Sequence, residues 1–285
     1  MLSAFQKKKD SVEMIIIGNS HTGAFRQRTI GTLRVMNFSY AGMELQDRFD
    51  LMRELFKEKT SVKYVLMAMD YDQIGHKISD AFIHNMFLPY IMNKQEGITR
   101  LASSLKPNDF LRHNRDLTIL YDYYISGHYN KNDTNFVPLN FTRKDDANGC
   151  ERRALELSRF NFSAQNIDNN LALIDKIKLF LASKGIHLIL LNTPKPNCFD
   201  ETYFKNLDNS NISILKSFVA KHHIAFFDFA KSNLFKEEDF QDFDHLNMEG
   251  SQILCDSLWK AISKTDELAL SKNPTTDHAK PGSQF

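Results

Sequence analysis

Short apolar runs alternate with amphipathic stretches in two parts of this sequence, and this alternation constrains the fold more than any other feature. Residues 14–17 form an apolar run that ends at Gly18 and is too short for a helix, so it predicts a buried strand. Residues 34–39 and 62–69 predict two more strands, and residues 44–59 space their apolar side chains as one helical face does. Strands and helices in alternation are typical of a parallel sheet that is covered on both faces.

The same alternation returns after about residue 160. Apolar positions over 167–181 predict a helix, and residues 186–191 predict a buried strand. Three more elements complete the pattern: a helix over 212–219, a strand over 224–229 and a helix over 249–263. Asn247 is available as the N-cap of the last helix. The two parts together predict five strands and a closing helix, within a single domain over residues 1–270.

Residues from about 75 to 160 have no regular pattern, and we interpret them as an insertion between the third strand and the next helix. An insertion there lies at the sheet edge where ligands enter such folds, so it is the expected source of substrate specificity. The insertion contains four tyrosines close together: Tyr121, Tyr123, Tyr124 and Tyr129. Such a cluster could stack against sugar rings, but more often it packs within its own subdomain. Residues 271–285 have no apolar periodicity and predict a disordered tail.

Charge and composition exclude several classes of protein. The chain has 36 Lys and Arg against 35 Asp and Glu, a net charge of +1, which argues against a nucleic acid or an anionic membrane as the main partner. No apolar run approaches the roughly 18 residues that span a bilayer. The chain as written predicts a cytoplasmic protein, and a location outside the cytoplasmic membrane is the alternative if an N-terminal anchor was removed.

The three cysteines are far apart in the sequence, at Cys150, Cys198 and Cys255. Their spacing matches neither a disulfide framework nor a thiolate metal site, so we interpret them as buried or inert thiols. Three other residues, His76, His84 and Asp133, also lack the spacing of metal ligands. The sequence therefore predicts no metal and no cofactor, and it leaves the oligomeric state open.

The first candidate for chemistry is Ser20, in the segment Gly18–Asn–Ser–His–Thr–Gly23 directly after the first strand. Ligands of open parallel sheets bind at the carboxyl ends of the strands, where a serine is exposed and well placed to act as a nucleophile. The alternative is that Ser20 only caps the helix that follows. The segment matches neither a phosphate loop nor a dinucleotide fingerprint. His21 beside it is interpreted as a packing or hydrogen-bonding neighbour.

The second candidate is His245, in the segment Asp242–Phe–Asp–His245 near the other end of the chain. A histidine that acts as a general base needs a carboxylate to fix its tautomer, and Asp242 three residues before it can supply one. Asp244 is the alternative orienting acid. Because this segment follows the last predicted strand, it lies at the same sheet edge as Ser20. The pair His222 and His223, in contrast, is interpreted as solvated.

The two segments together resemble the SGNH (GDSL-type) hydrolases, and in particular the branch that contains DltD-like and polysaccharide O-acetylation proteins. The resemblance implies a three-layer α/β/α sandwich with a five-stranded parallel sheet, of the flavodoxin-like kind. It also implies a triad of Ser20 as nucleophile, His245 as base and Asp242 as orienting acid.

The family's oxyanion hole, the group of N–H donors that binds the negative oxygen of the intermediate, consists of three positions. The resemblance places the first two at the N–H of Ser20 and at Gly42, after the second strand. The family's third donor is an asparagine, and Asp70 stands in its place here. An ionised Asp70 would repel the oxyanion, so there are three alternatives: Asp70 points elsewhere, another donor such as Asn192 or Asn19 takes the part, or activity is reduced.

Three functions follow from this interpretation. The first is a serine esterase or deacylase that acts on an acyl ester, favoured as an acetyl ester, of a carbohydrate or another small molecule. The second is an O-acyltransferase that uses the same residues and passes the acyl group to a sugar hydroxyl. The third is a non-catalytic binding or assembly protein with a degraded oxyanion hole, and Asp70 is the feature that favours it.

Overall fold

The computed structural model describes residues 2–23, 25, 27–40, 43–75, 148–158, 163–207 and 209–271 of the 285. Within these ranges the strands form one sheet in the order β2-β3-β1-β4-β5-β6. The strands are β1 (Met14–Ile17), β2 (Thr29–Ile30), β3 (Leu33–Asn37), β4 (Tyr64–Ala68), β5 (His187–Asn192) and β6 (Ala225–Asp228). The central strand β1 pairs in parallel with β3 on one side and with β4 on the other.

Five of the strands are parallel, as predicted, because β4 pairs with β5 and β5 with β6 in the same direction. The predicted count of five is nevertheless one too low. The additional strand, β2, is only two residues long and runs antiparallel to β3 at the edge of the sheet. Gly31 makes the turn between them with φ +57°, a conformation that favours glycine, and a Cβ there would collide with the Trp259 ring. So short a strand leaves no periodic pattern in the sequence.

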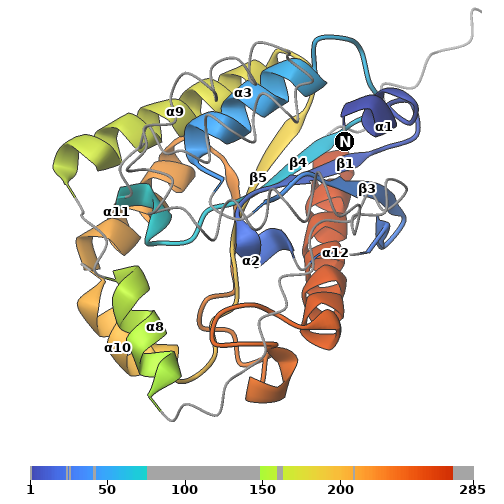
Figure 1. Ribbon diagram of the computed structural model, residues 1–285. Coiled ribbons are helices and arrows are strands. Elements are labelled where there is room, and N and C mark those ends of the chain that lie inside the picture. Colours follow the sequence, from blue (N-terminus) through green and yellow to red (C-terminus); the bar gives the residue numbers. More distant parts are fainter. Residues whose placement is uncertain are drawn as a thin grey trace, which may run out of the picture.

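Helices cover both faces of this sheet and make three layers (Figure 1). Strand β1 sends Ile15 and Ile17 to one face, where they join a core with α3 (Leu45–Leu55) and α9 (Ala164–Ala182). Its other two residues, Met14 and Ile16, join a second core with α12 (Met248–Ser271). All four residues of β1 are fully buried. The alternation of its side chains therefore joins the two layers of helices through one strand.

Further helical elements accompany this frame. They are α1 (Leu2–Gln6), α2 (Ser20–Gly23), α8 (Gly149–Ser158), α10 (Phe199–Asn206), α11 (Asn209–Lys221) and two 3-10 turns, η1 (Gln73–Gly75) and η2 (Glu237–Asp239). Helix α12 runs to Ser271, eight residues beyond the predicted end at 263. None of the helices in the described ranges has the length and apolar character needed to cross a membrane.

Most of the predicted insertion lies outside the described residues, which resume at residue 148 with α8. Residues 272–285 of the predicted tail also lie outside them. So do the seven insertion residues singled out above: Tyr121, Tyr123, Tyr124, Tyr129, His76, His84 and Asp133. The extent of the insertion and of the tail stays a prediction.

Two of the three cysteines form a disulfide, and the prediction of three inert thiols is wrong for them. Cys150 of α8 is bonded to Cys198, the residue that precedes α10, with Cα atoms 6.2 Å apart. The bond spans 48 positions of sequence, and only the packing of α8 on α10 brings its ends together. Cys255 is a free, buried thiol, and burial raises its pKa to about 12.

The disulfide predicts that one thiol per chain reacts with iodoacetamide in denaturant without reductant, and three with it. The double substitution Cys150→Ser/Cys198→Ser should lower the free energy of unfolding by about 2–4 kcal/mol, because the unfolded chain gains loop entropy. Intact mass and urea unfolding measure the two effects. Cys255→Ser is the control that leaves the reductant dependence in place. Three reactive thiols without reductant would contradict the bond.

Candidate active site

The segment that carries Ser20 begins where β1 ends. Gly18 follows the strand, and a Cβ there would collide with Thr22 and Ala68, so no larger residue fits. Ser20 opens α2 and is partly exposed, whereas His21 and Thr22 are buried. The side-chain oxygen of Asn19 accepts a hydrogen bond from the backbone N–H of His21 at 3.1 Å. Asn19 therefore caps this turn, and the capping role proposed for Ser20 is filled by its neighbour.

The end of β3 holds α2 in place. The side-chain amide of Asn37 donates to the backbone oxygens of Thr22 at 2.8 Å and of Phe25 at 3.0 Å. The hydroxyl of Thr22 lies 2.9 Å from that of Ser39. These contacts fix the direction in which the chain leaves β1, and with it the position of Ser20.

The loop that carries His245 is organised by Asp242. Its Oδ1 accepts hydrogen bonds from the backbone N–H groups of Asp244 at 3.0 Å and of His245 at 2.7 Å. Its Oδ2 lies 2.8 Å from Nδ1 of His245. One carboxylate thus folds the loop and orients the imidazole. Asn247 then accepts from the N–H of Gly250 at 2.9 Å, as its predicted role at the start of α12 requires.

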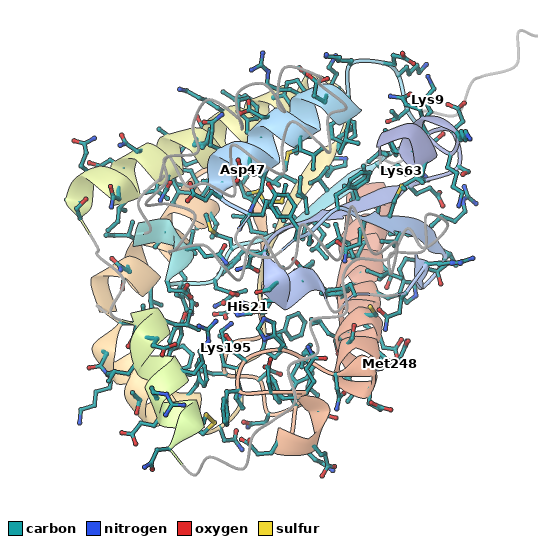
Figure 2. The ribbon with its side chains drawn as sticks, in the orientation of Figure 1. Lys9, His21, Asp47, Lys63, Lys195 and Met248 are labelled. Atoms are coloured by element: carbon teal, nitrogen blue, oxygen red, sulfur yellow. A yellow bond between two sulfur atoms is a disulfide. The ribbon has the colours of Figure 1, made fainter. Side chains whose placement is uncertain are left out.

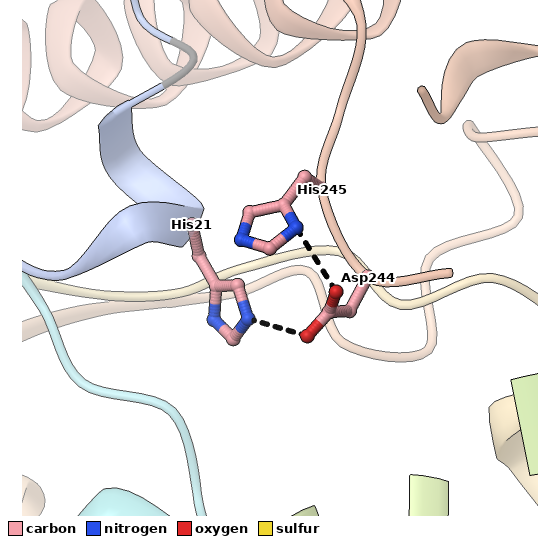
Figure 3. A group of neighbouring side chains, drawn as sticks. All are labelled: His21, Asp244 and His245. Carbon is pink, nitrogen blue, oxygen red and sulfur yellow. Dashed lines mark hydrogen bonds and ion pairs between the residues drawn. The ribbon is translucent and has the colours of Figure 1, made fainter. Parts of the chain in front are cut away.

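A second carboxylate, Asp244, contacts the same imidazole. Its Oδ1 lies 3.0 Å from Nδ1 of His245, and its Oδ2 lies 3.1 Å from Nε2 of His21 (Figure 3). The two histidine rings are 5.1 Å apart between centroids. Since His21 directly follows Ser20, Asp244 joins the segment of the predicted nucleophile to the segment of the predicted base. The sequence offered Asp242 and Asp244 as alternatives, and the structure places both on His245.

The carboxylate of Asp70 is engaged by other residues and is not available to bind an oxyanion. Its Oδ1 accepts from the backbone N–H and the hydroxyl of Thr193, both at 2.8 Å. Its Oδ2 lies 3.2 Å from Nζ of Lys195 and also contacts Nδ1 of His21. Burial by itself raises the pKa of Asp70, but the charges of Lys195 and His21 outweigh it and hold the pKa well below its ordinary value. An ionised carboxylate has no proton to donate, so Asp70 is not the third donor.

The side chains of the two alternative third donors of the oxyanion hole, Asn192 and Asn19, are both engaged elsewhere. The side-chain amide of Asn192 donates to Oδ1 of Asp228 at 2.9 Å, so Asn192 is engaged with β6. Asn19 uses its oxygen as the cap described above. Gly42 lies outside the described residues. The backbone N–H of Ser20 and that of Gly42 remain predicted donors.

Two basic residues at the site were not predicted. Lys195 is fully buried between Asp70, Thr193 and His21, with its Nζ 3.3 Å from Nδ1 of His21 (Figure 2). Arg153, on α8, donates from Nε to Oδ2 of Asp244 at 2.8 Å. Lys195 follows β5 by three residues, and its place after a predicted strand was the available signal. No signal in the sequence pointed to Arg153, because its helix belongs to the irregular middle.

The two carboxylates change the proton affinity of His245. Burial by itself lowers the pKa of His245, but the charge of Asp244 and the hydrogen bond with Asp242 outweigh it and raise the pKa to about 9. Burial by itself raises the pKa of Asp244, but the charge of His245 and the hydrogen bonds with both histidines hold it well below its ordinary value. The contacts of this site therefore favour the protonated form of His245 beside the ionised form of Asp244.

One group in the described ranges has the composition of a metal site. His21, Asp244 and His245 offer ligand atoms that all lie within 4.8 Å of one another. These atoms contact each other directly at hydrogen-bond distance, and Asp242 and Arg153 contact the same groups. We therefore interpret the group as a hydrogen-bonded network and not as metal ligands. The pair of His222 with Asp175 lies apart from it, half-buried at 2.8 Å.

The chain matches no protein-family model and no curated protein. Among solved structures it is similar to a GDSL-like lipase from Bacteroides thetaiotaomicron, at 12% identity over 91% of this chain and 90% of that one, with a TM-score of 0.44. It is similar to an alpha/beta hydrolase from the metagenome of Lake Arreo, at 14% identity over 89% and 96%, with a TM-score of 0.41. A catalytic mutant of an acetylxylan esterase from Geobacillus stearothermophilus matches at 12% identity over 89% and 94%, with a TM-score of 0.41.

The buried pair of Lys195 and Asp70 predicts a large loss of stability when one partner is removed. Lys195→Met leaves the charge of Asp70 without its cation inside the protein, so the free energy of unfolding should fall by about 3–5 kcal/mol. Adding Asp70→Asn should recover part of this loss. Urea unfolding measures both.

The matched control is Lys216→Met, which breaks a pair with Asp228 at the same distance of 3.2 Å but with a half-exposed lysine. An exposed pair contributes little, so this loss should stay under about 1 kcal/mol. Equal losses for Lys195→Met and Lys216→Met would contradict the structural role of Lys195.

Proposed function

We propose that this protein is a serine esterase or deacylase of the SGNH type. One observation carries the proposal: Asp242 orients His245, and Asp244 links that histidine to His21, the residue next to Ser20. The two segments are more than 200 positions apart in the sequence, and they meet at the carboxyl edge of the parallel sheet. Acyl transfer requires a nucleophile, a base and an orienting acid, and the proposal assigns these parts to Ser20, His245 and Asp242.

The proposed reaction has two halves. Ser20 Oγ attacks the ester carbonyl and His245 accepts the serine proton, while Asp242 holds Nδ1 of the ring. The N–H groups of Ser20 and Gly42 stabilise the negative oxygen of the tetrahedral intermediate. His245 returns the proton to the leaving alcohol, which leaves an acyl-enzyme. A water molecule, deprotonated by His245, then releases the acid and restores Ser20.

The substrate that we propose is an acetyl ester of a carbohydrate. The support is the resemblance of the two motif segments to proteins of polysaccharide O-acetylation, together with the near-neutral charge of the chain. The engagement of Asp70 with Thr193 and Lys195 gives that residue a structural role. The non-catalytic alternative therefore depends on the third donor of the oxyanion hole, a part that Asp70 does not take.

We further propose that the protein works outside the cytoplasm. The bond between Cys150 and Cys198 supports this alternative over the cytoplasmic one. Disulfides persist in oxidising compartments and are rare where glutathione and thioredoxin keep thiols reduced.

A fluorophosphonate probe tests the nucleophile directly. The native protein should acquire one covalent label, and Ser20→Ala should acquire none, because the probe needs a serine activated by a base. Ser183→Ala is the matched control: this serine ends α9, at the opposite edge of the sheet, and its loss should leave labelling intact. Mass spectrometry of the intact protein gives the readout. Equal labelling of native protein and Ser20→Ala would exclude Ser20 as the nucleophile.

Release of acetate distinguishes the hydrolase from the transferase. An acetylated xylo-oligosaccharide or a simple aryl acetate should release acetate at the same rate with and without added sugar acceptors, since water completes the reaction of a hydrolase. Ser20→Ala should reduce kcat at least about a thousandfold. Acetate release that stays at background until an acceptor is added, with transfer of the acetyl group to it, would favour the transferase instead.

A further inference from the structure

Two carboxylates meet one nitrogen of His245. Asp242 reaches Nδ1 at 2.8 Å from within the same loop turn, and Asp244 reaches the same atom at 3.0 Å. An imidazole nitrogen carries a single proton, so one carboxylate is sufficient to fix the tautomer. The local turn gives Asp242 that role. The second carboxylate therefore needs a different explanation.

Asp244 is held in its position by groups from two other parts of the chain. His21, on the α2 segment, contacts its Oδ2 through Nε2 at 3.1 Å, and Arg153, on α8, donates to the same oxygen at 2.8 Å. The Asp244 side chain is only 4% exposed. Arg153 and the two histidines stabilise its negative charge, and the carboxylate stays ionised beside His245.

The charged and titratable groups that contact His245 or its partners form one network. Asp242 and Asp244 come from its own loop, His21 from α2 and Arg153 from α8. Beyond His21 lie Asp70, after β4, and Lys195, after β5. Two carboxylates contact His245 directly, the His21 ring lies beside the His245 ring with 5.1 Å between centroids, and Arg153 contacts Asp244.

We propose that Asp244 is a positioning residue that sets the pH at which His245 becomes able to accept the proton of Ser20. The inference rests on the proposed function, because it assigns His245 the part of the base. A base must be deprotonated before it acts, and an anion in contact with the ring favours the protonated form. The raised pKa of His245, about 9, agrees in direction with this geometry. The resting site is then held inactive at low pH and becomes active as the solution turns alkaline.

The height of the activity plateau separates Asp244 from Asp242. Removing the charge of Asp244 takes away a contact that holds the proton on the ring, so the acidic limb of the pH–activity profile should move to lower pH and the plateau should be kept. Removing Asp242 also takes away such a contact, but it removes the group that folds the loop and orients the ring as well, so activity should fall at every pH. If a carboxylate had only a structural role, its removal would lower the plateau of the pH–activity profile and leave the pH of the acidic limb unchanged.

The first measurement is an NMR titration of His245, carried out in the Ser20→Ala protein so that no reaction is needed. His245→Gln identifies the signal. The midpoint should lie near pH 9 and should fall by at least about one pH unit in Asp244→Asn. The matched control is Asp175→Asn, which removes the carboxylate beside His222 and should leave the midpoint of His245 unchanged.

The second measurement is the rate of fluorophosphonate labelling of Ser20 as a function of pH. Native protein should lose rate as the pH falls below about 9. In Asp244→Asn the pH at which the labelling rate falls should decrease together with the NMR midpoint of His245. Labelling at pH 7, relative to its own plateau, should then rise about tenfold for each pH unit by which the midpoint falls. Asp244→Ser provides a second neutral variant if the asparagine folds poorly.

The two readouts distinguish the inference from the proposed function. An unchanged midpoint and an unchanged limb in folded Asp244→Asn or Asp244→Ser would overturn the role of Asp244 while leaving the esterase intact. Absence of any label on the native protein would instead overturn the esterase. In that case the titration still decides whether Asp244 controls the proton on His245.

Discussion

The parallel pairing of β1 with both of its neighbours is the constraint on which the rest of this structure depends. Its four residues are fully buried and alternate between two cores, so the strand can lie only in the middle of the sheet with helices on both sides. Parallel strands bring their carboxyl ends to one edge. The segments after β1, β4, β5 and β6 consequently converge there, and each brings at least one polar side chain to the network.

Bringing these polar side chains together inside the protein costs free energy of hydration, and the alternation of negative and positive side chains offsets that cost. A buried carboxylate or ammonium loses its hydration, and only close partners of opposite sign compensate for the loss. Asp70 lies between Lys195 and His21, and Asp244 lies between His21, His245 and Arg153. Each anion thus has at least two partners. The network favours one arrangement of its segments, because losing any member removes one of the few partners that stabilise a buried charge.

The sequence predicted most of the strands and helices and about half of the residues that form the candidate site. Strong apolar patterns predicted the five parallel strands and the helices that cover them, since burial on both faces leaves a clear record in residue type. The short motifs around Ser20 and His245 identified the two segments that meet. The two-residue strand β2 and the ion pair of Arg153 had no signal in the sequence, because they depend on tertiary contacts between distant segments. Lys195 had only its place after a predicted strand, and its ion pair also depends on such contacts.

Asp70 illustrates why residue type alone was insufficient. At a position where the family motif has an amide, a carboxylate looked like a defect in an oxyanion hole. The structure turns it toward Thr193, whose backbone N–H and hydroxyl both donate to it, and toward Lys195. The same aspartate then supports His21, and through His21 the carboxylate of Asp244. Asp70 is therefore an anchor for the contacts that surround His21 and Asp244.

The disulfide connects this network to the outer shell of the fold. Cys150 lies three residues before Arg153 on α8, and Cys198 lies three residues after Lys195 on the path to α10. The bond therefore ties together the two segments that supply Arg153 and Lys195, and the packing of α8 on α10 adds to the same restraint. Because one cation faces Asp244 and the other faces Asp70, fixing their segments limits the separation of the two anions as well. The covalent link and the charged network thus restrain the same edge of the sheet, from outside and from within.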